Sequence, residues 1–537
     1  MFRWRAVVST SVLGFALILG ILVQGQTNPL ASLAPEALQE WLTVISSDEF
    51  EGRATFSPGL DKAAAYISDR LKQAGVKPAG DDGSYLQRVG VQTVQVTNQS
   101  TLTIEVNGQS RVFRNGEGVV FPANVGVSRT LTLNDIEFVG YGLNLGPAHN
   151  DYAGRNVKGK AVVWLGSAAP VSLQGVSASR LLGSRSSTAI DEMNAAAGLS
   201  LAAGGSAGSP GRGGGISSFT TTTRLDFPKA PAVTVSDEVL EFLFSASGLN
   251  YADLAAKADR REDLPPATIK GAKLTFNLNA DYRVTATRMT QNVVGIIEGR
   301  DPQLKGTYVA FGAHYDHLGI NQNAPATADR ISNGADDDGS GSAALIGLAN
   351  AFMAAPKPRR SLMFAWHAGE ERGLWGSEYL ADHPPVPIEN IVAQFNIDMI
   401  GRNRDNDDSE ENTVYPVGAD RISTELHNIL IDVNSSLEQP LTLDFEMNDP
   451  ADSDRIYFRS DHFSYAAKGI PIIFFFTGLH PDYHQVSDSV DKIHFRKMSR
   501  IVRLVYEIGR RVADLDHAPV RDARGARTGR GSSGKIP

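Results

Sequence analysis

The sequence predicts an α/β protein in which a mostly parallel mixed sheet is flanked by helices and is accompanied by a β-rich segment. After about residue 291, short apolar runs alternate with helical patterns, which is typical of a sheet built from parallel strands. From about residue 93 the pattern changes instead to closely spaced strand signals. The chain has 537 residues, more than one compact core usually holds, so we expect two or three domains.

The N-terminal segment has the pattern of an export signal. Arg3 and Arg5 precede an apolar run that extends from about Ala6 to Val23. This pattern predicts a signal peptide over residues 1–26 and an exported protein, either periplasmic or secreted. A membrane anchor is the alternative, because the run is nearly long enough to span a bilayer.

Helical patterns and apolar strand patterns occur in two pieces of the chain, residues 27–95 and 287–516. In the first piece, apolar residues recur at helical spacing behind Pro35 and again from Leu60 to Leu71. In the second piece, the apolar runs predict strands and two longer patterns predict helices. The predicted strands cover residues 292–299, 307–314, 361–368, 391–398 and 470–478, and the predicted helices cover residues 342–353 and 497–515.

Residues 96–286 lie between these two pieces and are predicted to be β-rich, with a hairpin signal at Asn107 and Gly108. Within them, residues 195–223 are rich in glycine, alanine, serine and threonine, which predicts a surface loop. Residues 517–537 are basic and predict a disordered tail.

Charge and cysteine content limit the macromolecules that the protein could bind and the side chains that could hold a metal. The net charge of −9 argues against nucleic acid as a partner. Cysteine is absent, so a metal could be held only by histidine, aspartate or glutamate.

Acidic and imidazole side chains gather where the predicted strands end. In open α/β sheets, ligands bind at the carboxyl ends of the strands, so we expect these side chains to meet. Two histidines and three carboxylates would give each of two zinc ions one imidazole, one carboxylate and a share of a bridging carboxylate. The five candidate metal positions are His314, one of the three consecutive aspartates (Asp336, Asp337 or Asp338), Glu371, Asp398 and His484. Glu370 is then left over, and it suits a general base that deprotonates an attacking water.

Several motifs together resemble the co-catalytic di-zinc peptidases of the aminopeptidase Y and glutamate carboxypeptidase type. These motifs are "AHYDHLG", "NGADDDGSGSAALI", "HAGEERGLWGSEYL", "NIDMIG" and "RSDHFSYAAKGIPIIFFFTGLHPDYHQVSDSVDKI". The resemblance implies a zinc exopeptidase-like fold. It also implies that residues 27–95 and 287–516 form one domain, and that residues 96–286 are an insert containing a protease-associated (PA) domain, with its core at about residues 130–265.

The resemblance assigns roles to individual residues. His314 and Asp398 would hold one metal, Glu371 and His484 the other, and Asp337 would bridge them, with a cis peptide bond leading to Asp338. Three further residues would be catalytic: Glu370 as the base, Asp316 as the residue that orients the His314 imidazole, and Tyr483 as a hydroxyl that steadies the oxyanion.

The implied activity is removal of N-terminal residues from peptides or proteins by a water that two zinc ions activate, with cobalt or manganese as possible substitutes. A glutaminyl cyclase with one zinc and a metal-free binding protein on the same fold are the alternatives.

Other residues near the motifs have simpler interpretations. His317, His367, His462 and His480 are predicted to be structural or to support the ligands. The acidic run that starts at Arg404 lacks a calcium-loop pattern and predicts a solvated loop. Asp336 is predicted to be the least constrained residue of the three consecutive aspartates, so a neutral residue there should be tolerated.

Overall fold

A computed structural model describes residue 1 and residues 28–146, 149–173, 178–202, 217–222, 224–245, 247–325, 327–449, 452 and 454–522. The predicted signal peptide beyond Met1 and the tail from residue 523 onward lie outside the described residues. Within the described ranges, no helix is both long enough and apolar enough to cross a membrane.

The main sheet has four parallel strands at its centre, as the sequence predicts, and antiparallel strands on either side. The parallel strands lie in the order β18 (Ser361–His367), β15 (Tyr308–His314), β19 (Ile391–Ile397) and β22 (Ile472–Phe476). The flanking strands are β10 (Ser217–Thr221), β2 (Leu86–Asn98), β14 (Ala280–Ile297), β1 (Lys77–Pro78), β20 (Thr413–Val417) and β21 (Thr442–Leu443).

Both faces of the central strands are buried, which explains why these strands read as continuous apolar runs. One core contains Phe311, Phe364 and Phe395 and is covered by α1 (Pro35–Ile45), α2 (Pro58–Ala74), α7 (Gly341–Ala354), α9 (Thr424–Ser436) and α11 (Phe495–Ala513). The core on the opposite face contains Met363 and Ala365 and packs against α8 (Trp375–Asp382) and α10 (His462–Ala466). The small β16 (Gly319–Ile320) and β17 (Ile331–Ser332) pair separately.

A second sheet of ten strands lies within residues 101–278 and has a hydrophobic core of its own. Its strands are β3 (Thr101–Val106), β4 (Gln109–Asn115), β5 (Gly118–Val120), β6 (Arg129–Leu133), β7 (Ile136–Phe138), β8 (Ala161–Trp164), β9 (Ala197–Leu201), β11 (Ala232–Val235), β12 (Ala267–Ile269) and β13 (Ala272–Leu278). Its helices are α3 (Ala178–Gly183), α4 (Arg185–Ser187), α5 (Asp237–Phe244) and α6 (Tyr251–Asp259).

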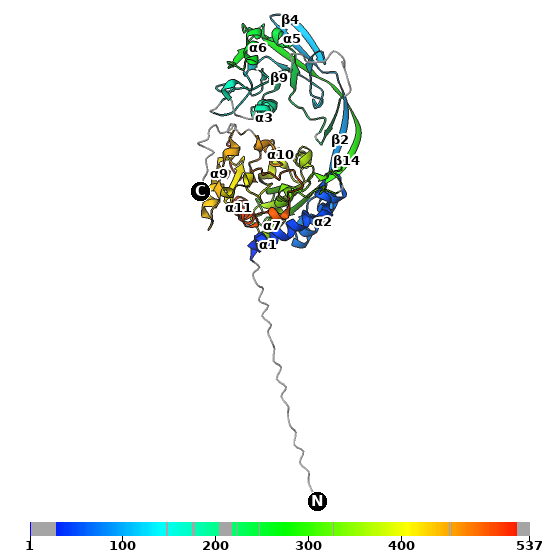
Figure 1. The fold of residues 1–537 in the computed structure, drawn as a ribbon, viewed down its shortest axis with the longest axis vertical. Helices are drawn as coiled ribbons and strands as arrows, with labels where there is room; N and C mark the ends of the chain where they lie inside the picture. The colour runs from blue at the N-terminus through cyan, green and yellow to red at the C-terminus, as the bar shows by residue number, and fades with distance from the viewer. Residues whose placement is uncertain are drawn as a thin grey trace.

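The long antiparallel strands β2 and β14 run along one side of the molecule and join the two sheets (Figure 1).

The prediction of a surface loop over residues 195–223 is wrong at two places. Residues 197–201 form β9, which pairs in parallel with β8 and β11. Residues 217–221 form β10, which pairs with β2 at the edge of the main sheet. Small residues fit here because β9 lies in a crowded position, where the Trp164 ring would meet any Cβ at residue 198. The other residues of this stretch from 203 to 216, and residue 223, lie outside the described ranges.

Candidate metal centre

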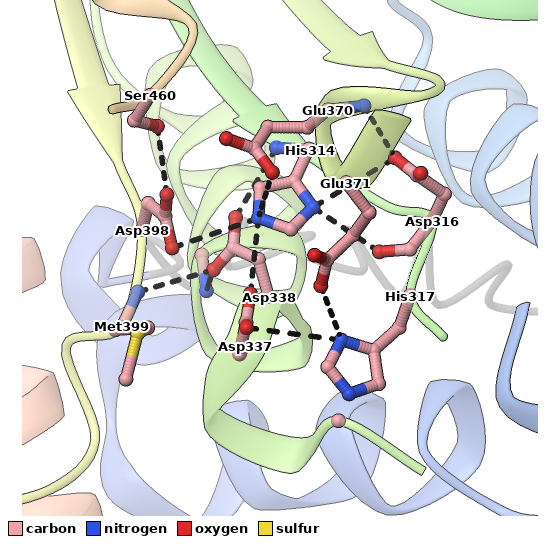
Figure 2. A network of polar contacts seen from close by, with 12 residues as sticks. His314, Asp316, His317, Asp337, Asp338, Glu370, Glu371, Asp398, Met399 and Ser460 are labelled. Atoms are coloured by element: carbon pink, nitrogen blue, oxygen red, sulfur yellow. Dashed lines mark hydrogen bonds and ion pairs between the residues drawn. The ribbon is translucent and has the colours of Figure 1, made fainter. Parts of the chain in front are cut away.

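The structure brings all five predicted ligands together at the carboxyl edge of the parallel strands. His314 ends β15, Asp398 follows β19, and Glu371 lies in the turn after β18. His484 follows β22 through a loop, and Asp337 lies in the irregular turn Ala335–Ser340 that leads into α7. Figure 2 shows the carboxylates of Asp337, Glu371 and Asp398 around the His314 imidazole. The topology therefore explains how residues 170 positions apart come to share one site.

Asp337 lies at the centre of the cluster. Its Oδ1 is 3.2 Å from His314 Nε2, and its Oδ2 is 3.2 Å from His484 Nε2. His314 Nε2 is also 3.6 Å from Asp398 Oδ1, and His484 Nε2 is 3.0 Å from Glu371 Oε2. Each oxygen of Asp337 thus faces one imidazole–carboxylate pair, which is the arrangement expected of a carboxylate that bridges two cations.

Asp338 follows Asp337 through a cis peptide bond, as the family resemblance implied. Its Oδ1 accepts hydrogen bonds from Gly341 N at 2.8 Å and Met399 N at 3.3 Å, and its Oδ2 accepts one from His314 N at 3.2 Å. Although this carboxylate lies close to His314 and Asp398, its oxygens are already engaged by backbone N–H groups. Asp338 therefore caps α7 and ties the ends of β15 and β19 together.

The prediction that Asp336 is weakly constrained is wrong. The side chain is fully buried, and its Oδ1 accepts a hydrogen bond of 2.6 Å from Gly401 N. Its Oδ2 is 3.3 Å from His480 Nε2. The three aspartates thus have three different partners, and Asp336 anchors the segment that follows β19.

Asp316 makes a different contact with His314 from the one predicted. His314 Nδ1 lies 3.1 Å from the backbone oxygen of Asp316, whereas the nearer carboxylate oxygen is 3.8 Å away. The carboxylate instead accepts hydrogen bonds from Thr55 Oγ1 at 2.9 Å and from Glu370 N at 3.1 Å. The Asp316 backbone orients the imidazole, and its side chain holds the backbone of Glu370.

Glu370 lines the same cavity as His314, Asp337 and Asp398. Its Oε2 is 4.0 Å from His314 Nε2. Burial raises the pKa of Glu370 well above its ordinary value, and the carboxylate of Asp398 adds to the effect against an opposing pull from His314. The side chain is therefore a proton acceptor that binds its proton firmly.

The acidic and imidazole side chains of the cluster shift one another's pKa. Burial alone would lower the pKa of His314, but the carboxylates of Asp398 and Glu370 raise it well above the ordinary value. Burial alone would raise the pKa of Asp337, but the imidazoles of His314 and His484, which face its two oxygens, hold it well below the ordinary value. Cations bound among these groups would take over the neutralising role of the protons.

The donor set fits divalent cations. Asp337 Oδ2 and Glu371 Oε1 are buried and have no hydrogen-bond partner among the described residues, although imidazole nitrogens lie near them. Buried carboxylate oxygens that lack hydrogen bonds need another source of positive charge. Carboxylate oxygens and imidazole nitrogens are ligands that zinc accepts.

Three residues that the sequence patterns did not single out support the ligands. Ser460 Oγ donates a hydrogen bond of 2.7 Å to Asp398 Oδ2, and Thr55 holds Asp316 as described above. Arg53 is fully buried and donates to the backbone oxygens of Tyr315, Asn333 and Gly334. Nothing in the sequence pattern around these residues indicates their roles, because each reaches the site from a distant segment.

His317 presents a further imidazole to the site. Its Nδ1 lies 2.8 Å from Glu371 Oε1 and 3.8 Å from Asp337 Oδ2, and its side chain is fully buried. His484, by contrast, is 35% exposed. The carboxylates of Asp337 and Glu371 thus lie near two imidazoles, one fully buried (His317) and one partly exposed (His484).

The fold and this cluster define an α/β protein with a divalent-metal centre at the carboxyl edge of its sheet. The model of peptidase family M28 matches residues 292–509, the part of the chain that contains all five candidate ligands.

The chain is also similar to several named proteins. A probable leucine aminopeptidase of Arthroderma benhamiae is 29% identical over 226 residues, which are 40% of this chain and 56% of the relative. Leucine aminopeptidase 1 of Trichophyton rubrum is 25% identical over 300 residues, 54% of this chain and 69% of the relative. The chain thus spans just over half the length of the first of these relatives. Among solved structures, an aminopeptidase from Aneurinibacillus sp. strain AM-1 is 19% identical with a TM-score of 0.43, and the match covers 93% of this chain and 98% of that one.

Proposed function

We propose that the protein is an exported, zinc-dependent aminopeptidase that binds two zinc ions and releases N-terminal residues from peptides. The observation that carries this proposal is the position of Asp337, with one oxygen toward His314 and the other toward His484. The names of the similar leucine aminopeptidases support the choice of reaction.

The residues divide between two ions. His314 and Asp398 would hold one zinc, Glu371 and His484 the other, and Asp337 both. Zinc bound there would supply Lewis acidity toward the scissile carbonyl and the attacking water. Cobalt or manganese could take the same positions, because the ligand types admit them.

Glu370 would act as general base and then as general acid. It accepts a proton from the attacking water at a carboxylate oxygen and donates it to the leaving amine. Two observations favour this role. The hydrogen bond from Glu370 N to the Asp316 carboxylate fixes the backbone of Glu370. Burial raises the pKa of the Glu370 carboxyl group, which makes the carboxylate more basic.

Tyr483 would donate its hydroxyl proton to the oxygen that becomes negatively charged on the scissile carbonyl. A free α-amino group would lie near Glu370 and Asp398, which places the first peptide bond of the substrate at the site. Substrates are therefore peptides or proteins with a free N-terminus.

The remaining parts of the proposal concern the insert and the location of the protein. The separate sheet and core of residues 101–278 favour an inserted domain, and we assign it to the PA type. We further propose that residues 1–26 direct export, and that the protein is held at a membrane only if they remain attached.

An exopeptidase panel tests the proposal. Zinc-loaded protein should hydrolyse aminoacyl-naphthylamides and free dipeptides, lose this activity to a chelator and regain it with zinc. Peptides with an acetylated N-terminus should resist cleavage. Removal of C-terminal residues from such blocked peptides would contradict the aminopeptidase assignment, and cyclisation of N-terminal glutamine without hydrolysis would identify the cyclase alternative.

A further inference from the structure

Arg459 lines the cavity that holds the metal-centre residues, yet the reaction described above gives it no role. The cavity is lined by Arg459 and Tyr483 together with His314, Asp337, Glu370 and Asp398. Arg459 Nη1 is buried and has no hydrogen-bond partner within the described ranges. A buried guanidinium nitrogen without a partner is uncommon and calls for a functional reason.

Arg459 makes one hydrogen bond at this cavity, from Nη2 to the hydroxyl oxygen of Tyr483 at 3.4 Å. Hydrogen bonds of catalytic groups are often long before substrate binds. The Tyr483 hydroxyl itself donates to no acceptor among the described residues. Because a phenol has a single proton and its oxygen accepts from Arg459, that proton remains available to a third group.

The rest of Tyr483 is fixed independently of Arg459. Asp482 is held by Arg402 Nη2 at 2.9 Å and by Lys492 Nζ at 2.7 Å, which anchors the backbone just before the tyrosine. The Tyr483 ring stacks on the His484 ring, with centroids 3.8 Å apart and planes at 25°. With the backbone and ring held, the direction of the hydroxyl proton is the remaining freedom.

The backbone of Arg459 is held next to the proposed metal ligand Asp398. It immediately precedes Ser460, whose hydroxyl is bound to Asp398. A tyrosine hydroxyl has an ordinary pKa of about 10, so it keeps its proton at neutral pH. The site therefore contains a phenol that is protonated, oriented through its oxygen and free to donate.

On this basis we propose that Arg459 is a positioning residue. By donating from Nη2 to the Tyr483 oxygen, it leaves the phenol proton for the oxygen of the scissile carbonyl as that oxygen becomes negatively charged. The inference rests on the proposed peptidase function and adds a residue to it. Arg459 acts through Tyr483 and contributes mainly when the charge develops, so it should affect turnover more than substrate binding.

A double-mutant cycle tests this coupling with leucyl-naphthylamide as substrate. The variants are Arg459→Met, Tyr483→Phe and the double variant, with Arg503→Met on the exposed face of α11 as a matched control. Arg459→Met should lower kcat by about 10- to 100-fold, approaching the loss typical of a missing oxyanion donor, and should change KM by no more than about twofold. The double variant should be no slower than about twofold below Tyr483→Phe, because the two residues act as one unit.

Two further readouts separate positioning from folding and from substrate recognition. Zinc content and the melting temperature should stay at wild-type values in Arg459→Met, while affinity for an aminophosphonic acid analogue of leucine should fall together with kcat. If Arg459→Met does not fold, Arg459→Gln takes its place, since its shorter side chain cannot reach the Tyr483 oxygen.

Three results would overturn the proposal. Losses that multiply in the double variant would mean that Arg459 acts without Tyr483. A rise in KM with unchanged kcat would mean that Arg459 binds the ground-state substrate. A loss confined to glutamyl-naphthylamide would mean that the guanidinium recognises a substrate carboxylate. Absence of hydrolysis by the wild-type protein would instead refute the proposed function itself, so the two failures are distinguishable.

Discussion

At the scale of single residues, Glu370 is proposed to transfer protons and not to bind metal. Glu370→Gln removes the proton acceptor but keeps the size of the side chain. We expect kcat to fall by about 10²–10⁴-fold, the usual contribution of general acid–base catalysis. Zinc content should not change, because Glu370 is not one of the proposed ligands. Kinetics and metal analysis on the same sample measure both quantities.

Glu389→Gln is the control for this substitution, since Glu389 is exposed. It should leave kcat at the wild-type value. If Glu370→Gln hydrolyses substrate at near-normal rates, the assignment of the base is incorrect.

The two imidazoles near Glu371 can be separated in the same way. His484→Gln should lower the affinity for the second zinc strongly, because it removes a proposed ligand. His317→Gln should have a smaller effect, about 10- to 100-fold, as expected for a residue that supports a ligand. Competition with a chromophoric chelator measures both affinities. A larger loss of zinc affinity in His317→Gln than in His484→Gln would mean that His317 is the ligand and His484 the supporting residue.

Asp336 provides a stability test at the residue scale. Asp336→Ala leaves the N–H group of Gly401 buried without its acceptor, which should lower the free energy of unfolding by about 1–3 kcal/mol. Asp432→Ala, at an exposed position of α9, is the control and should stay within about 0.5 kcal/mol. Equal stability of the two variants in urea unfolding would restore the view that Asp336 is unconstrained.

At the scale of elements, the sequence allows the central strands to be predicted well. The runs at residues 307–314, 361–368 and 391–398 correspond closely to β15, β18 and β19, because strands buried on both faces are continuously apolar. Residues 197–201 could not be recognised as a strand. Their small side chains carry little pattern, and their place is set by the neighbouring strands β8 and β11.

Some residues of the candidate site could likewise be predicted from the sequence, and others could not. Residues at strand ends, such as His314 and Asp398, could be predicted because topology brings strand ends together. Thr55, Ser460 and Arg459 could not, since each approaches from a segment whose path depends on tertiary packing. The resemblance supplied the role of Asp316, but only the coordinates reveal that its backbone oxygen, and not its carboxylate, contacts His314.

An ion pair between Glu192 and Arg455 connects the segment that carries the second sheet to the segment that lines the cavity. Glu192 Oε1 lies 2.6 Å from Arg455 Nη2, and both side chains are about nine-tenths buried. Thr188 Oγ1 also accepts from Arg455 Nη2, at 3.2 Å. Arg455 directly precedes Ile456, which lines the cavity. Glu192→Ala should therefore lower the free energy of unfolding by about 3–5 kcal/mol, because it leaves a buried cation unpaired.

Glu238→Ala is the matched control in the insert, since its ion pair with Arg111 is exposed. It should change stability by less than about 1 kcal/mol. If the two variants unfold alike, Glu192 does not link the insert to the cavity wall.

At the scale of the whole molecule, two sheets with separate cores are joined by β2 and β14, and the metal centre lies in only one of them. Length and the change in pattern near residue 93 predicted more than one domain. The pairing of β2 with β14 could not be predicted, because 181 residues, 99–279, separate the two strands. The reaction proposed for this molecule follows from the buried cluster and not from the overall shape.

The number of zinc ions per chain tests the central claim most directly. Full-length protein is loaded with zinc, freed of excess metal by gel filtration and analysed by elemental mass spectrometry against protein concentration. Two zinc ions per chain are predicted, one on each side of Asp337. One ion per chain would contradict the bridged pair and favour a cyclase-like enzyme, and none would indicate a metal-free binding protein.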